Sequence, residues 1–254
     1  MPGNALHALG IKEDPYRKER EELAAVFRWI ARLNMHEGIA NHFSLSVSDD
    51  GTKFLINPRW MHFSRIKASD LLLLDANDPA TMEQENAPDP TAWGLHGTIH
   101  RRLPAARAAL HVHSKHVTVL AALKESTLPP IDQNTMRFFN RVVVDESFGG
   151  LAFEEEAERA CKLLGNAPIM MMGNHGVMVT APTIAQAFDE LYYFERAAET
   201  AVTAYMTGKD LRRASDDVAE RTCEQWLNYT EGFAEAHLRE VMAILDEDTP
   251  DYRD

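Results

Sequence analysis

The chain has 254 residues, of which 45% are hydrophobic, and this is enough to bury a sizeable core. Acidic residues outnumber Lys and Arg by 39 to 26, and the formal net charge is −13. This charge argues against nucleic acids and anionic membranes as partners, because repulsion would oppose both. No apolar run approaches the roughly eighteen residues of a membrane span, and the N-terminus lacks the apolar core of a signal peptide. We therefore expect a cytoplasmic protein with a small-molecule partner.

Hydrophobic periodicity predicts several features in the first half of the chain. Apolar side chains at helical spacing indicate an amphipathic helix, and alternation indicates two strands joined by an Asp-Asp-Gly turn. A polar stretch rich in Asp, Asn and Pro indicates a surface loop. Asp89 followed by Pro90 is typical of the cap and first position of a helix. We expect the first helix at residues 16–36 and the two strands at 43–47 and 53–56. The loop is expected at 75–90 and the second helix at 90–103.

The second half of the chain continues with short apolar strands between helices. Ser114 is the expected cap of the helix that follows the first of these strands. Strands and helices are interleaved without a regular βαβ rhythm, which favours one layered α/β domain over residues 1–254 rather than a barrel. We expect strands at residues 108–113, 142–145, 169–172 and 177–180, and helices at residues 114–123, 154–164, 183–205 and 215–245.

Two histidines end the apolar stretch Ala-Leu-His-Val-His. On a strand His111 and His113 leave the same face while Val112 enters the other, which is a chelating geometry. His175, on the turn Gly-Asn-His-Gly, could approach the same ion and leave open coordination positions, as catalytic sites do. The spacing alone leaves open that His-x-His is a chance occurrence among eleven histidines and that His175 only fills a turn.

A second pair, His96 and His100, lies one helical turn apart and shares a helix face. The pair lacks the glutamate of the HExxH pattern, so we expect His96 to face the site and His100 to pack or contact solvent. The sequence contains no GxGxxG, GxxxxGK[ST] or GxSxG pattern, which weakens nucleotide-fold and serine-hydrolase interpretations. Lys115 leaves a Schiff-base lysine open, although a surface role is commoner for such a residue.

Five ordered motifs resemble the class II aldolase/adducin family. The resemblance implies a three-layer α/β/α fold around a mostly antiparallel sheet, and a homotetramer with active sites at subunit interfaces. It implies a divalent ion on His111, His113 and His175, with zinc as first choice and manganese or iron as alternatives. It also implies that Asn41 and Ser44 bind substrate. The motifs are Gly38–Ser44, Ile56–Pro58, Leu95–His100, Leu110–Ser114 and Gly173–Gly176, within a core of about residues 20–205 that precedes a helical extension at about 215–245.

Two departures distinguish this chain from the sugar-phosphate aldolases of that family. Those enzymes place an acid/base glutamate nineteen positions before the first metal histidine, where this chain has Ala92. Their small-residue phosphate loop is replaced here by residues 57–62, which include Arg59 and Trp60. Both changes resemble the adducin-like branch of the family. We expect Arg59 to bind a substrate carboxylate, with Trp60 as a pocket wall, and the alternative is an exposed loop arginine.

These features predict a metal-dependent carbon–carbon lyase, of decarboxylase or aldolase type, that acts on a non-phosphorylated, carboxylate-bearing small molecule through a metal-stabilised enolate. Aldol cleavage needs a base for the departing hydroxyl proton, and Ala92 cannot serve as one. Decarboxylation needs only a later proton donor. The candidate donors are His96, Asp89, Tyr192 and Tyr193, and the alternative for both tyrosines is packing within a long helix.

Two other classes of function stay open. Three neutral histidines can also hold Fe(II) and activate oxygen, so a non-haem iron oxygenase is the first alternative. The second is a non-catalytic, adducin-like binding module, for which a metal-free protein would be the sign. A homotetramer agrees with the apolar positions of the C-terminal helical region, which need cover: Val218, Trp226, Leu227, Phe233, Leu238 and Met242.

Overall fold

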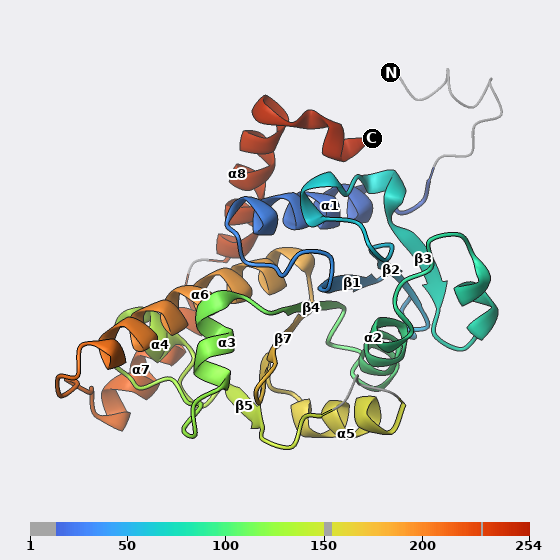
Figure 1. The fold of residues 1–254 in the computed structure, drawn as a ribbon. Coiled ribbons are helices and arrows are strands. Elements are labelled where there is room, and N and C mark those ends of the chain that lie inside the picture. The colour runs from blue at the N-terminus through green and yellow to red at the C-terminus, as the bar shows by residue number, and fades with distance from the viewer. Residues whose placement is uncertain (1–13, 150–153, 230) are drawn as a thin grey trace.

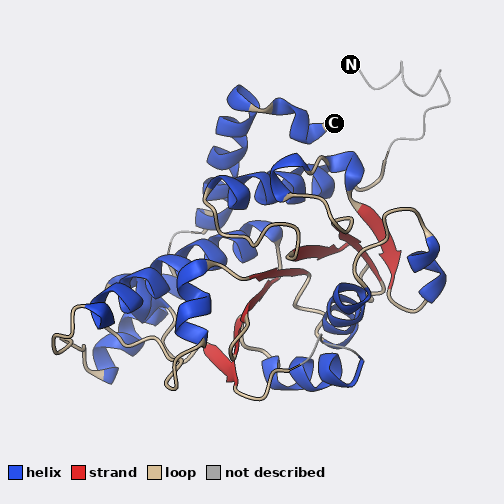
Figure 2. Cartoon of the chain, in the orientation of Figure 1, coloured by secondary structure: helices blue, strands red, loops and turns tan. Residues whose placement is uncertain are grey.

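The computed structural model describes residues 14–149, 154–229 and 231–254. Its strands are β1 His42–Ser46, β2 Lys53–Ile56, β3 Leu72–Asp75, β4 Ala108–Val112, β5 Val142–Asp145, β6 Ile169–Met172 and β7 Gly176–Ala181. They form one sheet in the order β3-β2-β1-β4-β7-β6-β5 (Figure 1, Figure 2). Neighbouring strands are antiparallel except β5 and β6, which are parallel. The expected α/β class with a mostly antiparallel sheet is confirmed.

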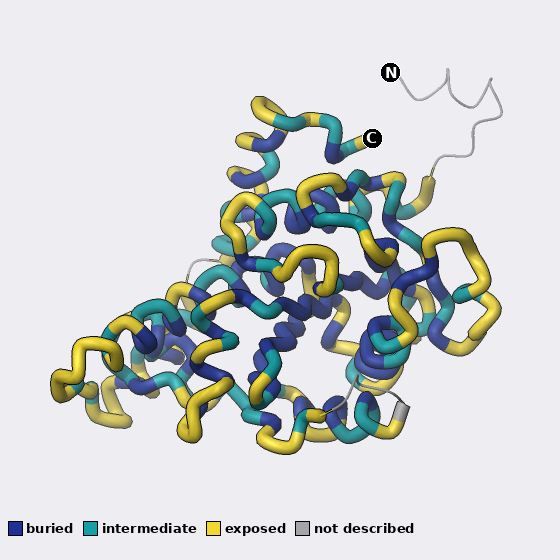
Figure 3. Tube along the Cα trace, viewed as in Figure 1, coloured by how far each residue is buried: buried dark blue, intermediate teal, exposed yellow. Residues whose placement is uncertain are grey.

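Helices cover both faces of this sheet. They are α1 Arg17–Arg32, α2 Pro90–Arg102, α3 Lys115–Ala121, α4 Gln133–Arg137, α5 Glu154–Leu164, α6 Ile184–Met206, α7 Asp216–Leu227 and α8 Phe233–Asp248. The main core cluster lies between the sheet and α1, α3, α6 and α8, while α2 and α5 pack on the other face. The strands are therefore buried in the middle of the molecule (Figure 3). Within the described ranges, no helix is long and apolar enough to cross a membrane.

Strand β6 shows why a sheet covered on both faces needs a continuous apolar sequence. Ile169 and Met171 belong to the core cluster under α3 and α6, whereas Met170 and Met172 belong to the cluster under α2 and α5. Successive side chains of a strand point to opposite faces, so all four are buried. His111 lies on β4, which is separated from β6 by β7, and by the same alternation it points to the face that α2 covers in part.

The start of α3 differs from the sequence-based expectation. Ser114 precedes the helix, but the prediction that its side chain caps α3 is wrong, because its hydroxyl donates to Glu195 Oε2 at 2.6 Å. Glu195, a buried residue of α6, accepts hydrogen bonds from the backbone N–H groups of His116 and Val117 at 3.1 and 3.2 Å. A carboxylate distant in the sequence therefore caps α3 and ties it to α6.

Two further elements differ from the prediction. The expected continuous helix over residues 215–245 is instead two helices, α7 and α8. Gly232, directly before α8, has a φ of 81°, a backbone conformation that favours glycine and interrupts helical continuity. In addition, β3 forms an edge of the sheet that periodicity did not predict, because its run of leucines lacks a polar alternation.

Candidate metal centre and adjoining cavity

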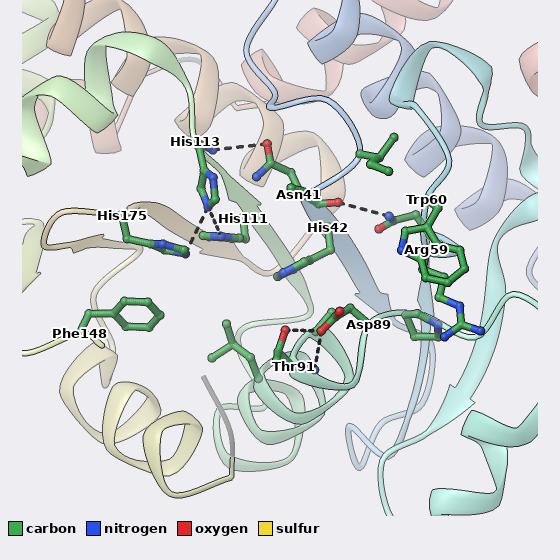
Figure 4. Close-up of a pocket in the computed structure, with 16 residues that line it drawn as sticks. Asn41, His42, Arg59, Trp60, Asp89, Thr91, His111, His113, Phe148 and His175 are labelled. Atoms are coloured by element: carbon green, nitrogen blue, oxygen red, sulfur yellow. Dashed lines mark hydrogen bonds between the residues drawn. The ribbon is translucent and has the colours of Figure 1, made fainter. Parts of the chain in front are cut away.

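Three histidines converge where the end of β4 meets the turn between β6 and β7. Strand β4 pairs with β7 in a register that places Val112 opposite Val177, so His175 comes beside His113. The Nε2 atoms of His111 and His113 lie 3.0 Å apart, and those of His113 and His175 lie 3.2 Å apart. The candidate ligand atoms of the three histidines all lie within 4.8 Å of one another. Figure 4 shows the three rings directed toward a common point.

The Nδ1 hydrogen bonds of His111 and His113 leave the Nε2 lone pairs of these two rings free. His111 Nδ1 donates to the carbonyl oxygen of Val177 at 2.9 Å, and His113 Nδ1 donates to Glu37 Oε2 at 2.6 Å. Because those oxygens accept, the proton of each neutral ring sits on Nδ1. Burial lowers the pKa of His111, and that of His175 to about 4. Three imidazoles whose candidate ligand atoms converge fit a divalent ion such as zinc, manganese or iron.

Glu37 is a functional candidate that the sequence pattern did not indicate. Its carboxylate fixes the orientation and tautomer of His113, although 66% of its side chain is exposed. We expect Glu37→Ala to weaken metal affinity by about tenfold, the lower end of the usual effect of an outer-sphere partner, because solvent can replace an exposed carboxylate. Metal competition with a chelator measures the change. Glu85→Ala, an exposed glutamate outside the site, is the control, and equal affinity in the two variants would contradict the role of Glu37.

A cavity of about 420 Å³ opens beside the three histidines. Its size suits a small organic molecule. The walls come from the residues around the start of β1, the loop after β2, the first turns of α2 and the segment after β5 (Figure 4). Beside the histidines already described, the lining includes Asn41, His42, Asn57, Arg59, Trp60, Asp89, Ala92, Leu95 and Phe148.

Comparison with known proteins agrees with this geometry. Residues 21–202 match the family model described as the Class II Aldolase and Adducin N-terminal domain. The chain belongs to the class II aldolase/adducin family.

It is 27% identical to the decarboxylase NovR of Streptomyces niveus, over 74% of this chain and 71% of that protein. The chain is 26% identical to a Streptomyces roseochromogenus protein named 4-hydroxy-3-prenylphenylpyruvate oxygenase/4-hydroxy-3-prenylbenzoate synthase, over 74% and 69% of the two chains. The crystal structure of an aldolase II superfamily protein from Pseudomonas syringae superposes with a TM-score of 0.86 at 27% identity, covering 97% of this chain and 100% of that one.

Arg59 and Trp60 lie on the side of the cavity opposite the three histidines in this class II aldolase/adducin family member (Figure 4). The guanidinium of Arg59 stacks over the Trp60 ring, 4.4 Å from its centroid, and has no ion-pair partner among the described residues. Trp60 is 70% exposed and has a φ of 62°, which is strained for a bulky side chain. The loop therefore holds an unpaired cation and an aromatic ring at the rim of the cavity.

Asn41 lines the cavity and has a buried amide group. Its Oδ1 accepts from the backbone N–H groups of Glu37 at 2.7 Å and His113 at 3.4 Å, so the amide also fixes the loop that carries Glu37. Its Nδ2 is buried and has no hydrogen-bond partner within the described ranges. An unpaired buried donor is costly.

His42 lines the cavity of this family member, although the sequence did not indicate it as a functional residue. It lies opposite His111 in the pairing of β1 with β4, and the two ring centroids are 4.8 Å apart. His96, which we expected to face the site, is fully buried behind His42, with its Nε2 2.6 Å from His42 Nδ1. Ser44, an expected substrate-binding residue, is also fully buried and contacts His96 and His100. Neither His96 nor Ser44 lines the cavity.

Of the other predicted catalytic residues, Asp89 lies at the cavity and Tyr192 does not. Asp89 lies at the cavity but caps α2, since its Oδ1 accepts hydrogen bonds from Thr91 N at 2.9 Å and Thr91 Oγ1 at 2.5 Å. Tyr192 does not line the cavity, and its ring packs against Tyr193 and His237 between α6 and α8. Ala92 does line the cavity, and its methyl group offers no acid or base there.

The buried histidines of α2 predict an acid-sensitive stability. Burial lowers the pKa of His100 from 6.5 to about 4. Between those values the unfolded chain binds a proton that the folded chain does not, so stability falls as the pH drops from 6.5 to 4. In His100→Gln, the slope of unfolding free energy against pH should decrease by up to about 1.4 kcal/mol per pH unit in this window. Urea unfolding of metal-free protein measures the slope, and parallel curves for the two proteins would contradict the prediction.

Proposed function

We propose that this member of the family is a metal-dependent carbon–carbon lyase, of decarboxylase or aldolase type, acting on a non-phosphorylated, carboxylate-bearing small molecule. One observation carries the proposal. The converging imidazoles of His111, His113 and His175 open onto a cavity whose other side holds Arg59, a cation with no acidic partner among the described residues. A free guanidinium can bind a carboxylate through two parallel hydrogen bonds.

Different residues of the cavity have different proposed roles in substrate binding. Bound there, a divalent ion would supply a Lewis acid for adjacent substrate oxygens. Arg59 binds the substrate carboxylate, and Asn41 Nδ2 donates a hydrogen bond to a second oxygen. Leu95 and Phe148 add apolar walls, and Trp60 adds an aromatic ring at the rim. Charged and polar groups act more strongly in a partly buried site than they do in water.

Ala92 affects which lyase subtype fits the cavity. Its methyl group cannot remove the hydroxyl proton that an aldol cleavage releases, and the nearby Asp89 uses Oδ1 to cap α2. Decarboxylation places a smaller demand on the site, because it needs only a later proton donor. The similarity to NovR, a protein named as a decarboxylase, supports the same subtype. Aldol cleavage remains within the proposal if another group accepts the proton.

An iron oxygenase is the alternative that a specific observation favours. The relative from Streptomyces roseochromogenus is named as an oxygenase, and three neutral imidazoles without a carboxylate are a ligand set that suits Fe(II) as well as zinc or manganese. The two functions differ in the metal and in their need for oxygen. Metal identity is therefore the property that separates them.

Metal analysis followed by a substrate screen tests the proposal. The protein is purified under anaerobic conditions, its metal is identified, and a panel of 2-oxo and 2-hydroxy acids is incubated with it. Carbon dioxide release and oxygen consumption are both monitored. Release of carbon dioxide, or of an aldehyde, without oxygen uptake supports the lyase. Oxygen uptake with iron supports the oxygenase, and a protein that binds no metal supports a non-catalytic, adducin-like module.

We also propose a homotetramer, in which copies of the chain cover apolar surface. The structure accounts for part of the expected interface within one chain, since Leu238 is buried against the core. Leu227 and Met206 remain 60% and 81% exposed, near the ends of α7 and α6. Sedimentation velocity at micromolar concentration should give a mass about four times that of one chain. A single monomeric species would contradict this prediction.

A further inference from the structure

Four polar side chains form a line between the sheet and α2, of which Ser44, His96 and His100 are buried and His42 lies at the cavity. His42 and Ser44 alternate with Phe43 on β1 and point to the same face, while His96 and His100 are one turn apart on α2. The two pairs interdigitate. His42 Nδ1 lies 2.6 Å from His96 Nε2, His96 Nδ1 contacts Ser44 Oγ, and Ser44 Oγ lies 2.7 Å from His100 Nε2.

The far end of this line fixes the direction of every hydrogen bond in it. His100 Nδ1 lies 2.9 Å from the carbonyl oxygen of Ala106, which can only accept, so His100 carries its proton on Nδ1. Its Nε2 then accepts from the Ser44 hydroxyl, which in turn accepts from His96 Nδ1–H. His96 Nε2 is left as an acceptor, and its partner, His42 Nδ1, must donate.

The reverse direction would require a charged ring in the core. If Ser44 donated to His96, its oxygen would have to accept from His100 Nε2, and His100 would carry protons on both nitrogens. Burial of both helix histidines opposes this, because it lowers the pKa of His96 and brings that of His100 to about 4. The uncharged arrangement is therefore the one present at neutral pH.

We infer that Ala106, His100, Ser44 and His96 hold His42 as its Nδ1–H tautomer, so that His42 Nε2 presents a lone pair to the cavity and accepts a hydrogen bond from a ligand hydroxyl. His42 lines the cavity, and its Nε2 has no hydrogen-bond partner among the described residues. Figure 4 shows its ring projecting between the metal centre and the loop of Arg59.

This arrangement selects one class of ligand. A carboxylate bound by Arg59 and a hydroxyl that donates to His42 together describe a small hydroxy acid. An ether at the hydroxyl position would leave the His42 lone pair without a donor, which costs affinity in a partly buried site. The ligand class rests on the proposed function, whereas the tautomer of His42 does not.

Nitrogen NMR of metal-free protein, labelled with ¹⁵N-histidine, tests the tautomer directly. Bare and protonated ring nitrogens have different shifts, and free histidine prefers the opposite, Nε2–H form. The His42 signals, assigned by their loss in His42→Gln, should show a protonated Nδ1 and a bare Nε2. In Ser44→Ala the His42 proton should move toward Nε2. Ser46→Ala, another buried serine of β1, is the matched control and should keep the wild-type pattern.

Either of two NMR results would overturn the inference. One is a protonated Nε2 on His42 in the wild-type protein, and the other is an unchanged His42 pattern in Ser44→Ala. Zinc titration adds a third check. A zinc-induced displacement of His42 Nε2 equal to that of His111 Nε2 would make His42 a metal ligand rather than an acceptor for the substrate.

Calorimetric titration of zinc-loaded protein tests the selection of a hydroxyl. Glycolate is compared with methoxyacetate, which differs by methylation of the hydroxyl. We expect glycolate to bind at least about tenfold more tightly, with most of this preference lost in Ser44→Ala and kept in Ser46→Ala. Equal affinities in the wild-type protein would overturn the acceptor role. Failure of both acids to bind would count against the proposed carboxylate-binding function itself, while the NMR pattern would still decide the tautomer.

Discussion

Alanine in place of His111, His113 or His175 is expected to remove most bound metal and abolish turnover. Each histidine contributes one of three converging Nε2 atoms, and the two remaining imidazoles bind a divalent ion much more weakly. We expect about one ion per chain in the wild-type protein and a small fraction of that in each variant after dialysis. Elemental analysis by mass spectrometry measures the occupancy directly.

A histidine outside the centre provides the control for this experiment. His237 lies on α8, where its Nδ1 contacts Asp189, and it is not one of the three converging histidines. The His237→Ala variant should therefore bind as much metal as the wild-type protein. Circular dichroism establishes that each variant is folded before its occupancy is compared. Wild-type metal content in a folded triple variant of His111, His113 and His175 would show that the ion binds elsewhere.

Arg59→Ala is expected to lower kcat/KM by roughly 10- to 100-fold without loss of metal. The guanidinium has no acidic partner among the described residues, so its charge is free to bind a substrate carboxylate. A charge-assisted hydrogen bond contributes about 1.5 to 3 kcal/mol, which corresponds to this range of rate. Arg59→Lys should recover only part of the rate, because lysine cannot form two parallel hydrogen bonds.

Arg65 supplies a matched control for the Arg59 variants. It is an exposed arginine on the same connection after β2, but it does not line the cavity, so Arg65→Ala should keep wild-type kinetics. Kinetics are measured on the carboxylate that the substrate screen identifies. Unchanged kcat/KM in Arg59→Ala would mean that Arg59 is an exposed loop residue and that the substrate is anchored elsewhere.

The fold and the grouping of three histidines could be predicted from local patterns together with the resemblance to the family. His111 and His113 share a strand face by spacing alone, and the Gly-flanked turn sets His175 apart from the strands around it. The sheet follows from apolar runs such as β6, whose side chains are buried on both faces. The resemblance to the family then ordered these elements into a mostly antiparallel sheet.

The rest of the site depends on contacts between segments distant in the sequence. Glu37 reaches His113 from the loop before β1, and His42 lies beside His111 only through the register of β1 with β4. His96 has helical spacing that correctly predicts a shared face with His100. Helical spacing does not reveal that His42 lies between His96 and the cavity. The prediction therefore named His96 as the residue facing the site, whereas His42 has that position.

Carbon–carbon cleavage in the absence of oxygen tests the central claim most directly. The protein is stripped of metal with a chelator, divided, and reloaded in part with zinc or manganese, and both portions are incubated anaerobically with the carboxylate panel. We predict release of carbon dioxide or an aldehyde by the reloaded protein and none above background by the stripped protein. Equal release by both portions, or turnover that occurs only when oxygen is admitted and consumed, would contradict a metal-dependent lyase.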